Sequence, residues 1–461
     1  MVEWIAAYRE SLAELPVLSP SEPGEIKAKL PPSPPRTGEG LRGILGDLDR
    51  IVLPGITHWN HPGFFAYFPS NSDLASVLAD MACAGLGAQG MSWQTSPAAT
   101  EMEEVVMDWL RQMLGLDGEF TGVIQDTAST STFCALLCAR EWSSAFGQTR
   151  GGLQAEEAPL VVYASDQAHA SVEKAALLAG FGRDNLRLIP TDASHALRMD
   201  LLERAILDDL SAGRRPCAMV AAVGTTATTA VDPLEGMARL SAEHGIWLHV
   251  DAAMAGTAMI CPECRWMWKG IEAADSVVLN PHKWMGTGFD LSAYFVKDPV
   301  HLVRVMSTNP SYLLTDQDGQ VRNLRDWGIP LGRRFRALKL WFLLRDQGVE
   351  GLQARVRRDL ANAQWLASKV EATPEWRIMA PVNLQTVCLR HVPEGMEDEE
   401  ELKAHNLEIA AAINRSGRFY LTPSLLKGRQ ILRVSIGCSS TELQDVAALW
   451  EALQAAVPAL V

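Results

Sequence analysis

The chain has 461 residues, 48% of them hydrophobic, which predicts a large buried core and two or three domains. Its 41 basic and 55 acidic residues give a formal net charge of −14, which disfavours nucleic acid and anionic membranes as partners. The first residues, MVEWIAAYRE, lack the pattern of a signal segment, and no apolar run approaches membrane-spanning length, so we expect a cytoplasmic protein.

The amino-terminal residues are predicted to form a helical arm. Apolar residues at helical spacing predict helices over residues 3–15 and 41–52. Between them, residues 30–38 (LPPSPPRTG) exclude regular structure, because proline lacks an amide donor and restricts the residue before it. Two helices joined in this way cannot form a core alone, so we expect them to pack on the main domain or on a second subunit.

Residues 59–70, WNHPGFFAYFPS, combine aromatic and turn-forming residues and contain neither lysine nor arginine. Two interpretations stay open. The segment is either a loop that faces the core or the wall of an apolar substrate slot. A helix is predicted next over residues 74–86, and another begins at Ser96-Pro97 with acidic residues in its first turns. In the second interpretation, the slot is lined by Trp59, Tyr67, Phe68, Pro69 and Ser70.

From Gly122 onward, short apolar strands alternate with helices, and polar residues collect where the strands end. The carboxyl ends of parallel strands meet along one edge of a sheet. The pattern therefore indicates an α/β fold with a mainly parallel sheet and a site at that edge. No GxGxxG or P-loop spacing occurs, which argues against a nucleotide. The predicted strands are 123–125, 160–163, 219–223, 246–251 and 276–279.

The strand at 276–279 is followed by Asn280-Pro281-His282-Lys283-Trp284, which places Lys283 in a turn. A lysine that follows a buried strand and lies between histidine and tryptophan is expected to be partly desolvated. Desolvation lowers the pKa of an amine and frees it to attack a carbonyl. The alternative is a solvated lysine in an ordinary loop.

Asp251 ends another apolar strand and is followed by Ala252 and Ala253. A carboxylate beside two small residues suits a flat, polar ring close to the backbone, and a pyridine ring fits. Pyridoxal phosphate (PLP) needs a lysine for covalent attachment, an acid for its ring nitrogen, a wall for its ring and a cradle for its phosphate. Lys283 and Asp251 are candidates for the first two roles.

Two other strand ends offer the wall and the cradle. Residues 126–132 (DTASTST) place small hydroxylated residues at a helix start, where amides bind phosphate, although helix capping gives the same pattern. His169 follows the strand at 160–163, where its imidazole can stack on a flat ring or serve as a helix cap.

The last third of the chain predicts a separate small domain. Residues 309–320 form a polar loop with one tyrosine, and a long helix runs to about residue 371. Strands at 387–390 and 431–436 alternate with helices near 399–415 and 441–456, which indicates an α+β domain. The expected domains are 1–95 (arm and slot segment), 96–340 (PLP-binding) and 341–461 (small domain).

The eight cysteines lie mostly among apolar residues, which is typical of reduced thiols in a core. Cys261 and Cys264 have the spacing of half a zinc site, but no second ligand pair follows. We therefore expect no metal.

In combination, these motifs resemble a known family. Asp126–Ser131, DQAH at 166–169, GTT at 224–226, HVDAA at 249–253 and NPHKW at 280–284 occur in the order found in group II PLP-dependent decarboxylases. The chain most closely resembles the aromatic L-amino acid decarboxylases, from HWNHP through SWQTSPAATE to IPLGRRFR. The resemblance implies PLP fold type I, as in aspartate aminotransferase, with an N-terminal helical arm. It also implies a homodimer with the active site at its interface.

The resemblance also implies roles for individual residues. Lys283 should bind PLP covalently, Asp251 should pair with the pyridinium nitrogen, and His169 should stack on the ring. Tyr312 matches the tyrosine of a mobile catalytic loop that reaches into the neighbouring subunit's site and supplies a proton to Cα. The other implied cofactor-binding residues are Thr127, Ala128, Ser129, Thr226, Ala253, Asn280 and His282. The implied substrate-binding residues are Trp59, Tyr67, Phe68, Pro69, Ser70, Gln89, Met91, His169 and Gly332.

The implied reaction is decarboxylation of an aromatic L-amino acid (tryptophan, tyrosine, phenylalanine or dopa) to the amine and CO2. Relatives with phenylalanine at the position of Tyr312 instead form an aldehyde by oxygen-dependent oxidative deamination, so the tyrosine favours the amine. A slot without lysine or arginine suits glutamate and aspartate poorly, and Gln89 can hydrogen-bond a phenol, a catechol or an indole. A non-aromatic substrate nevertheless stays open.

Rival PLP proteins lack support in the residues. An aminotransferase should have an arginine for the substrate carboxylate, and a desulfurase should have a loop cysteine, which is absent between Asn309 and Arg325. A PLP-binding protein without activity would leave Tyr312 without a role. Four positions depart from the family. Asp126 replaces a frequent glycine at the phosphate turn, and Met254 follows HVDAA where an aromatic residue is more usual. Gln89 and Met91 match apolar pocket residues that the partner subunit contributes.

Overall fold

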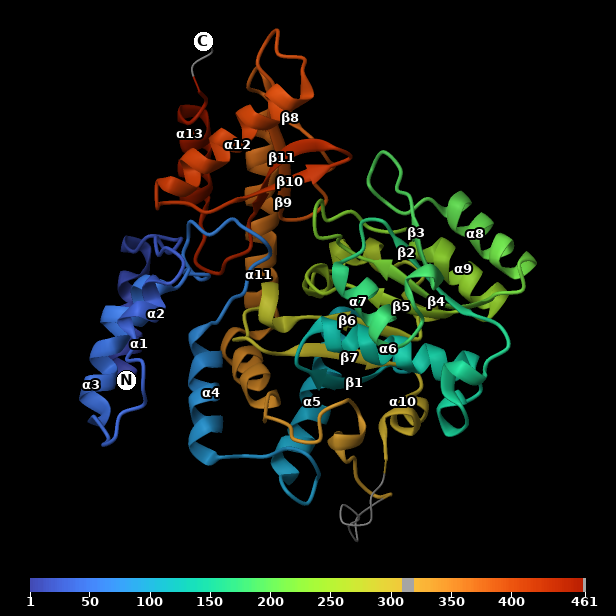
Figure 1. Ribbon diagram of the computed structural model, residues 1–461. Coiled ribbons are helices and arrows are strands. Elements are labelled where there is room, and N and C mark those ends of the chain that lie inside the picture. Colours follow the sequence, from blue (N-terminus) through green and yellow to red (C-terminus); the bar gives the residue numbers. More distant parts are fainter. Residues whose placement is uncertain (309–318, 459–461) are drawn as a thin grey trace. The chain divides into compact units, whose positions relative to one another are not determined.

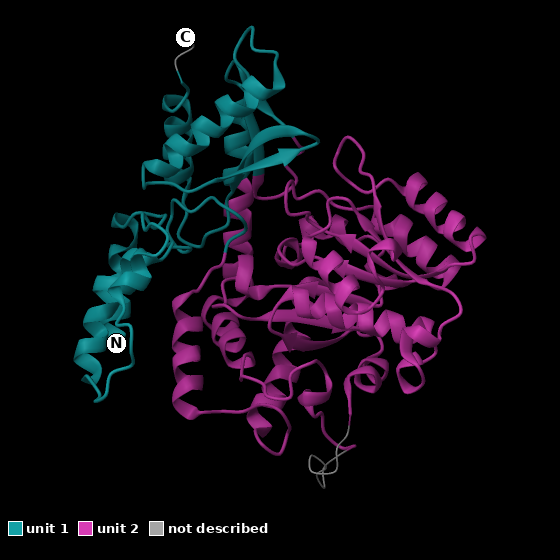
Figure 2. Ribbon diagram, viewed as in Figure 1, with its two compact units in different colours: residues 1–69, 362–379, 387–461 teal, residues 70–361, 380–386 magenta. Residues whose placement is uncertain are grey.

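The computed structural model describes residues 1–308 and 319–458 (Figure 1). These residues form two compact units, shown in Figure 2. The larger unit contains residues 70–361 and 380–386, and the smaller unit contains 1–69, 362–379 and 387–461. The division into three domains expected from the sequence stays a prediction.

The larger unit is built on a seven-stranded sheet with the strand order β1-β7-β6-β5-β4-β2-β3. The five strands from β2 to β6 pair in parallel, whereas β7 lies antiparallel to both β6 and β1. The predicted α/β fold with a mainly parallel sheet is therefore confirmed. The strands are β1 (Thr121–Gln125), β2 (Leu160–Ser165), β3 (Leu186–Ile189), β4 (Arg215–Ala222), β5 (Trp247–Asp251), β6 (Ser276–Leu279) and β7 (Ser292–Val296).

The sheet forms the core of this unit because its strands consist mainly of apolar residues. Every residue of β2, β5, β6 and β7 is buried, as expected for strands that are covered on both faces. Among the helices, α6 packs against β4 to β7, and α8 and α9 pack against β4. The helices are α4 (Leu74–Leu86), α5 (Pro97–Leu114), α6 (Ala128–Ser143), α7 (Ala170–Leu178), α8 (Met199–Ser211), α9 (Leu234–His244) and α10 (Pro299–Met306).

Local signals explain where the helices begin and end. Helix α5 begins after Ser96, whose side chain accepts a hydrogen bond from the Ala99 amide at 3.3 Å, and Pro97 occupies its first turn. Helix α4 has the bounds that the sequence predicts and ends at Gly87 in the left-handed conformation. Helix α11 (Ala337–Glu371) is interrupted at Gly348, whose φ of 63° and ψ of 175° are not helical.

The smaller unit contains the four-stranded sheet β10-β11-β9-β8, with helix α12 packed on β10 and β11. The strands are β8 (Trp376–Ile378), β9 (Thr386–His391), β10 (Thr422–Leu426) and β11 (Arg429–Ser435), and the helices are α12 (Glu399–Arg415) and α13 (Leu443–Ala455). The predicted arm helices correspond to α1 (Val2–Ser11) and α3 (Gly40–Asp47), and α2 (Glu25–Lys29) lies between them. Within the described parts of the chain, no helix is both long and apolar enough to cross a membrane.

Candidate active site

Lys283 lies in a single π-helical turn, η10 (Pro281–Met285), that follows β6 directly. The turn begins where Asn280-Pro281 ends the strand, because proline cannot donate to the sheet. It ends at Gly286, whose φ of 107° favours glycine. A Cβ atom at Gly286 would lie 2.3 Å from Oδ2 of Asp73, so only glycine allows this close approach.

Asp251 ends β5, the parallel neighbour of β6, and is 9% exposed. Its Oδ1 accepts a hydrogen bond from the Ala253 amide at 3.1 Å, and the Ala253 carbonyl accepts one from the Asn280 amide at 2.8 Å. The turns after β5 and β6 are therefore bonded to each other. Asp251 and Lys283 consequently lie at the same edge of the sheet.

His169 lies at this edge as the N-cap of α7, four residues after the end of β2. Its Nδ1 accepts a hydrogen bond from the Ser171 amide at 3.2 Å, so its neutral ring carries the proton on Nε2. Desolvation lowers the pKa of His169, the charge of Asp251 raises it, and the charge of Lys283 lowers it. The three predicted catalytic side chains thus lie close enough to interact.

The predicted phosphate cradle is the start of α6. Thr127 is its N-cap, with Oγ1 accepting a hydrogen bond from the Thr130 amide at 3.4 Å, and the following amides begin the helix. The Asp126 carboxylate is turned toward this site, because its Oδ1 accepts a hydrogen bond from the Thr127 amide at 2.6 Å. Ala128 is buried and Ser129 is exposed.

Asn280 directly precedes the lysine turn and His282 lies within it, and both are buried. Nδ1 of His282 accepts a hydrogen bond from the Leu291 amide at 2.9 Å, which leaves the proton of the neutral ring on Nε2. Burial, followed by the Lys283 charge, lowers the pKa of His282 to about 4, so the ring is a neutral donor. Oδ1 of Asn280 is buried without a hydrogen-bond partner among the described residues.

The remaining predicted cofactor residues also follow strands of the sheet. Thr226 lies in the turn after β4 and is exposed, while Ala253 follows β5 and is partly buried. Thr225 shapes the first of these turns, since its Oγ1 accepts a hydrogen bond from the Ala230 amide at 3.1 Å. The sheet edge therefore carries residues from all the predicted cofactor motifs.

Three of the predicted substrate residues gather in the larger unit. Oε1 of Gln89 accepts hydrogen bonds from the amides of Met91 at 2.8 Å and Arg333 at 3.4 Å. A Cβ atom at Gly332 would lie 3.7 Å from Nε2 of Gln89. Arg333 fixes this group, because its buried guanidinium is paired with Glu103 at 2.8 Å. Gln89, Met91 and Gly332 are thus neighbours, and their role in a substrate site stays a prediction.

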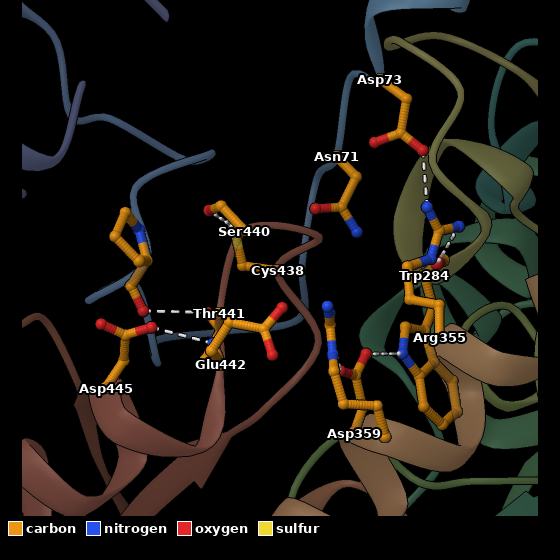
Figure 3. Close-up of polar contacts among 12 residues, drawn as sticks. Asn71, Asp73, Trp284, Arg355, Asp359, Cys438, Ser440, Thr441, Glu442 and Asp445 are labelled. Atoms are coloured by element: carbon orange, nitrogen blue, oxygen red, sulfur yellow. Dashed lines mark hydrogen bonds and ion pairs between the residues drawn. The ribbon is translucent and has the colours of Figure 1, made fainter. Parts of the chain in front are cut away.

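The aromatic segment forms a cluster within the smaller unit. The Trp59 ring lies 4.6 Å from the Phe64 ring and 5.6 Å from the Tyr67 ring, centroid to centroid. Phe64 and Phe65 face the core, whereas Trp59 and Tyr67 are exposed, so the segment faces the core only in part and its role as a slot wall stays a prediction. Thr441 holds the segment, with Oγ1 donating to the Pro62 carbonyl at 2.8 Å (Figure 3).

Residues 59–70 contain no lysine or arginine, but the fold places Arg433 against this aromatic cluster. The Arg433 guanidinium lies 4.6 Å from the centroid of the Phe68 ring and donates to the Tyr67 carbonyl. Burial lowers the pKa of Arg433 to about 10. Pro69 is buried at the end of the cluster and Ser70 begins the larger unit. Tyr312, the remaining predicted catalytic residue, lies outside the described residues.

Sequence reasoning missed Asn71, whose Nδ2 donates to the Lys283 carbonyl at 3.0 Å. The sequence gives a partial signal for Asn71, because it directly follows the aromatic segment. Its distance of 212 positions from Lys283 gives no sign that the two residues are in contact. Within the described parts of the chain, no three histidine, cysteine or acidic side chains are grouped so that they could hold a metal ion.

Residues 23–392 match the model of the pyridoxal-dependent decarboxylase conserved domain. The chain belongs to this family. It is 42% identical to phenylacetaldehyde synthase of Arabidopsis thaliana over 98% of its own length and 94% of the relative's.

Solved structures give the same result. The crystal structure of Oryza sativa TDC with PLP and tryptamine matches with a TM-score of 0.96 and 36% identity, covering 99% of this chain and 96% of the other. Catharanthus roseus tryptophan decarboxylase in complex with L-tryptophan matches with a TM-score of 0.93 and 37% identity, covering 100% and 97%. The chain is thus a PLP-dependent amino-acid decarboxylase of fold type I.

The residues at the sheet edge fit PLP. A lysine amine, a carboxylate and a neutral imidazole lie together, beside a helix start that can receive a phosphate. The buried amide of Asn280 has an unpaired atom there, and amide oxygen and nitrogen are interchangeable by rotation. A ligand with hydrogen-bonding oxygens, such as a phosphate, would complete its pairing.

Proposed function

We propose that this enzyme decarboxylates an aromatic L-amino acid to the corresponding amine and CO2. The observation that carries the proposal is the grouping of Lys283, Asp251 and His169 at one sheet edge. The likeness to structures solved with tryptamine and with L-tryptophan supports the aromatic substrate class.

PLP, when bound, supplies a ring that accepts the electron pair left on Cα when CO2 departs. The Asp251 carboxylate faces the ring nitrogen in our proposal and keeps its proton in place. The neutral imidazole of His169 lies against the ring without adding a positive charge. The Nε2 proton of His282, the amide of Asn280 and the first amides of α6 hold the phosphate.

Lys283 has two roles in this proposal, which are to hold the cofactor through Nζ and to leave it when the substrate amine arrives. Tyr312 then gives a proton to Cα, a contribution of about 100-fold to 10,000-fold for a general acid of this kind. Thr226 and Ala253, at the same edge, contact the cofactor ring.

Gln89 bears on which aromatic substrate is favoured. Its Oε1 already accepts two backbone amides, so its side chain offers only the Nε2 donor. A phenol or catechol oxygen can accept from this donor, whereas an indole N–H cannot. We therefore propose that tyrosine and dopa are preferred over tryptophan. Met91 and Gly332 complete this part of the substrate site.

Measuring CO2 and amine from purified holoenzyme with tyrosine, dopa, phenylalanine and tryptophan tests the proposal. We expect equal amounts of CO2 and amine, with the fastest rates for tyrosine and dopa. Release of CO2 from glutamate or aspartate alone would contradict the substrate class.

A second candidate is aldehyde formation, which the 42% identity to a phenylacetaldehyde synthase favours. Tyr312 favours the amine instead, because aldehyde-forming relatives are expected to have phenylalanine at this position. The two reactions differ in their products, since the aldehyde route consumes oxygen and releases ammonia and peroxide. We expect Tyr312→Phe to shift the products toward the aldehyde, and an unchanged amine yield would refute the role of Tyr312.

We further propose a homodimer that acts in the cytoplasm. Helix α4 exposes four large apolar side chains, and apolar patches of this kind mark interfaces. They are Leu74, Leu78, Met81 and Leu86. A reducing compartment suits the eight cysteines, which are free and, except for Cys83, buried.

A further inference from the structure

The turn that carries Lys283 cannot satisfy its own last carbonyl groups. Inside η10, the Lys283 amide donates to the Asn280 carbonyl at 2.9 Å, and the Gly286 amide donates to the Pro281 carbonyl at 3.0 Å. The carbonyls of Lys283, Trp284 and Met285 come last, where a helical turn has no following amides to offer. Buried carbonyls without partners destabilise the fold, so these groups need donors from elsewhere.

Two side chains supply those donors. Asn71 donates from Nδ2 to the Lys283 carbonyl at 3.0 Å. Arg355, on α11, donates from Nη2 to the Trp284 carbonyl at 3.3 Å and also to the Met285 carbonyl. The main chain of the lysine turn is thus bound at three successive carbonyls.

Asp73 fixes the Arg355 guanidinium, as Figure 3 shows, with Oδ2 accepting from Nη1 at 2.5 Å. The same oxygen accepts from Nε2 of Gln347 at 2.7 Å. The Asp73 amide donates to the Gly286 carbonyl at 2.9 Å, immediately after the turn. Asp73 therefore binds both the arginine and the end of the turn that the arginine holds.

A second buried carboxylate holds the side chain next to Lys283. The indole Nε1 of Trp284 donates to Oδ2 of Asp359 at 2.8 Å (Figure 3), and both residues are 0% exposed. Burial raises the pKa of Asp359 to about 6, while the charge of Arg358 and the Trp284 hydrogen bond lower it. Burial holds the Trp284 indole in the core, and the hydrogen bond to Asp359 fixes the orientation of its ring.

Buried ion pairs of this kind contribute little net stability compared with apolar packing, because both charges lose their water. Here the two buried carboxylates and Arg355 all act on residues 284–286, beside the lysine that holds the cofactor. These three charged side chains are therefore better explained by a role in positioning Lys283 than by a general contribution to stability.

We propose that Asp73, Arg355 and Asp359 are positioning residues that fix the turn 283–285 and thereby set the direction in which Lys283 Nζ meets PLP. The proposal rests on the proposed function. It concerns the geometry of the lysine and adds no chemical step.

Trp284→Phe tests this inference, because it removes the N–H donor and keeps an aromatic ring in the core. We expect kcat to fall about 10-fold with KM changed less than about twofold, since small misplacements of a reacting group lower the rate of the bound complex. We also expect the pKa of the Lys283–PLP linkage in the holoenzyme, titrated by absorbance, to shift by about half a unit or more.

Tyr163→Phe is the matched control. The Tyr163 hydroxyl on β2 donates to the buried carboxylate of Asp209 at 2.9 Å, so this variant also removes one donor from a buried acid. We expect a similar loss of thermal stability in both variants, but no change of kcat or of the linkage pKa in Tyr163→Phe. Equal stability losses with an unchanged linkage pKa and kcat in Trp284→Phe would overturn the proposal.

Arg355→Lys provides an independent test should Trp284→Phe fold poorly. Lysine keeps the charge opposite Asp73 but lacks the planar fork that binds Asp73 through Nη1 and the two carbonyls through Nη2. We expect a shifted linkage pKa here too, and a linkage like that of the unaltered enzyme would contradict the role of Arg355. Failure of the proposed function would look different, because the unaltered protein would then attach PLP but form no amine from an aromatic amino acid.

Discussion

Asp126 is the residue whose charge conflicts most directly with the expected ligand. Its carboxylate accepts the Thr127 amide at the start of α6, an amide that a phosphate at this helix start would use. The carboxylate also repels a phosphate through space. Asp126 is therefore expected to weaken cofactor binding in this chain.

Asp126→Asn should tighten PLP binding about fivefold, since it removes one like charge, worth about 1 kcal/mol, and keeps the side-chain shape. Titration of the apoenzyme with PLP measures the dissociation constant. Asp117→Asn is the control, because Asp117 also accepts a nearby amide, that of Glu119 at 2.9 Å, but precedes β1 at the opposite end of the strand. Unchanged or weaker binding in Asp126→Asn would refute the conflict.

Gln89→Leu should lower kcat/KM for tyrosine about fivefold relative to phenylalanine. The reason is that the Nε2 donor pairs with the phenol oxygen, and one hydrogen bond contributes about 1 kcal/mol. Steady-state amine formation from both substrates gives the ratio. An identical ratio in the variant and the unaltered enzyme would show that Gln89 does not contact the phenol.

The residues that we propose perform the chemistry could be predicted better than the residues that hold them. Lys283 and Asp251 each follow an apolar strand, so the sequence alone places both at the sheet edge. Arg355 looks like one of several charged residues on a long helix. Only the folded chain brings its guanidinium to the carbonyls of the lysine turn.

At the scale of the element, Gly348 interrupts α11 in a conformation that is essentially restricted to glycine. A Cβ atom there would meet nothing within 4 Å, so a substitution would act through backbone strain alone. The sequence predicts one uninterrupted helix in this region, because a single glycine in a helical pattern is often tolerated.

Gly348→Ala should lower the free energy of unfolding by about 1 to 3 kcal/mol, as measured by urea unfolding. Gly351→Ala, three residues further along α11, is the control. Its Cβ atom would be 3.5 Å from that of Gln347, an ordinary contact. There we expect stabilisation of about 0.5 to 1 kcal/mol. Destabilisation of the same size at both positions would argue against strain at Gly348.

The buried pair His391–His405 joins β9 to α12, with Nδ1 and Nε2 2.8 Å apart. Burial lowers the pKa of both rings, the His405 charge lowers that of His391 further, and Glu375 raises both. Because the folded pKa values lie below the unfolded value of about 6.5, the unfolded chain binds more protons as the pH falls below it. The stability that the neutral pair contributes is therefore present above about pH 6.5 and lost below it.

His405→Gln should reduce this dependence. When the pH falls from about 8 to about 5.5, we expect the free energy of unfolding to drop by about 0.5 kcal/mol more in the unaltered protein than in the variant. The expected difference is this small because solvent screens partly exposed charges. Urea unfolding at both pH values measures the difference. Equal losses in the two proteins would show that the pair does not titrate with folding.

The sequence predicted the elements of the sheet unevenly. The parallel strands β2, β4, β5 and β6 are bounded by turn residues and were identified as strands. Strand β7 (Ser292–Val296) was missed, because it follows β6 without an α-helix between them, whereas these four strands were identified by their alternation with helices. It is also the strand that runs antiparallel to β6 and so departs from the βα pattern.

At the scale of the whole molecule, the proposed dimer depends on the apolar face of α4. Leu78, 43% exposed, lies on that face. Leu78→Glu should shift the enzyme from dimer to monomer, because a charge cannot be buried at an interface without a partner. Sedimentation velocity measures the change. Leu207→Glu on α8, where Leu207 is 50% exposed, is the control and should remain dimeric. A dimer that survives Leu78→Glu would place the interface elsewhere.

Contacts between distant segments could not be predicted from local patterns. Asn71 reaches the Lys283 carbonyl, and Arg433 covers the Phe68 ring although no cation occurs in residues 59–70. Composition and periodicity describe neighbours along the chain, whereas these contacts join residues hundreds of positions apart. The family resemblance supplied the cofactor, and the fold shows how the turn that contains Lys283 is held.

The attachment of the cofactor tests the central claim most directly. Reducing the holoenzyme with borohydride fixes PLP to the amine that holds it, and mass spectrometry of the digested protein then identifies the modified lysine. We expect one PLP group per chain, on the peptide that contains Lys283. Modification of a different lysine, or of none, would contradict the account.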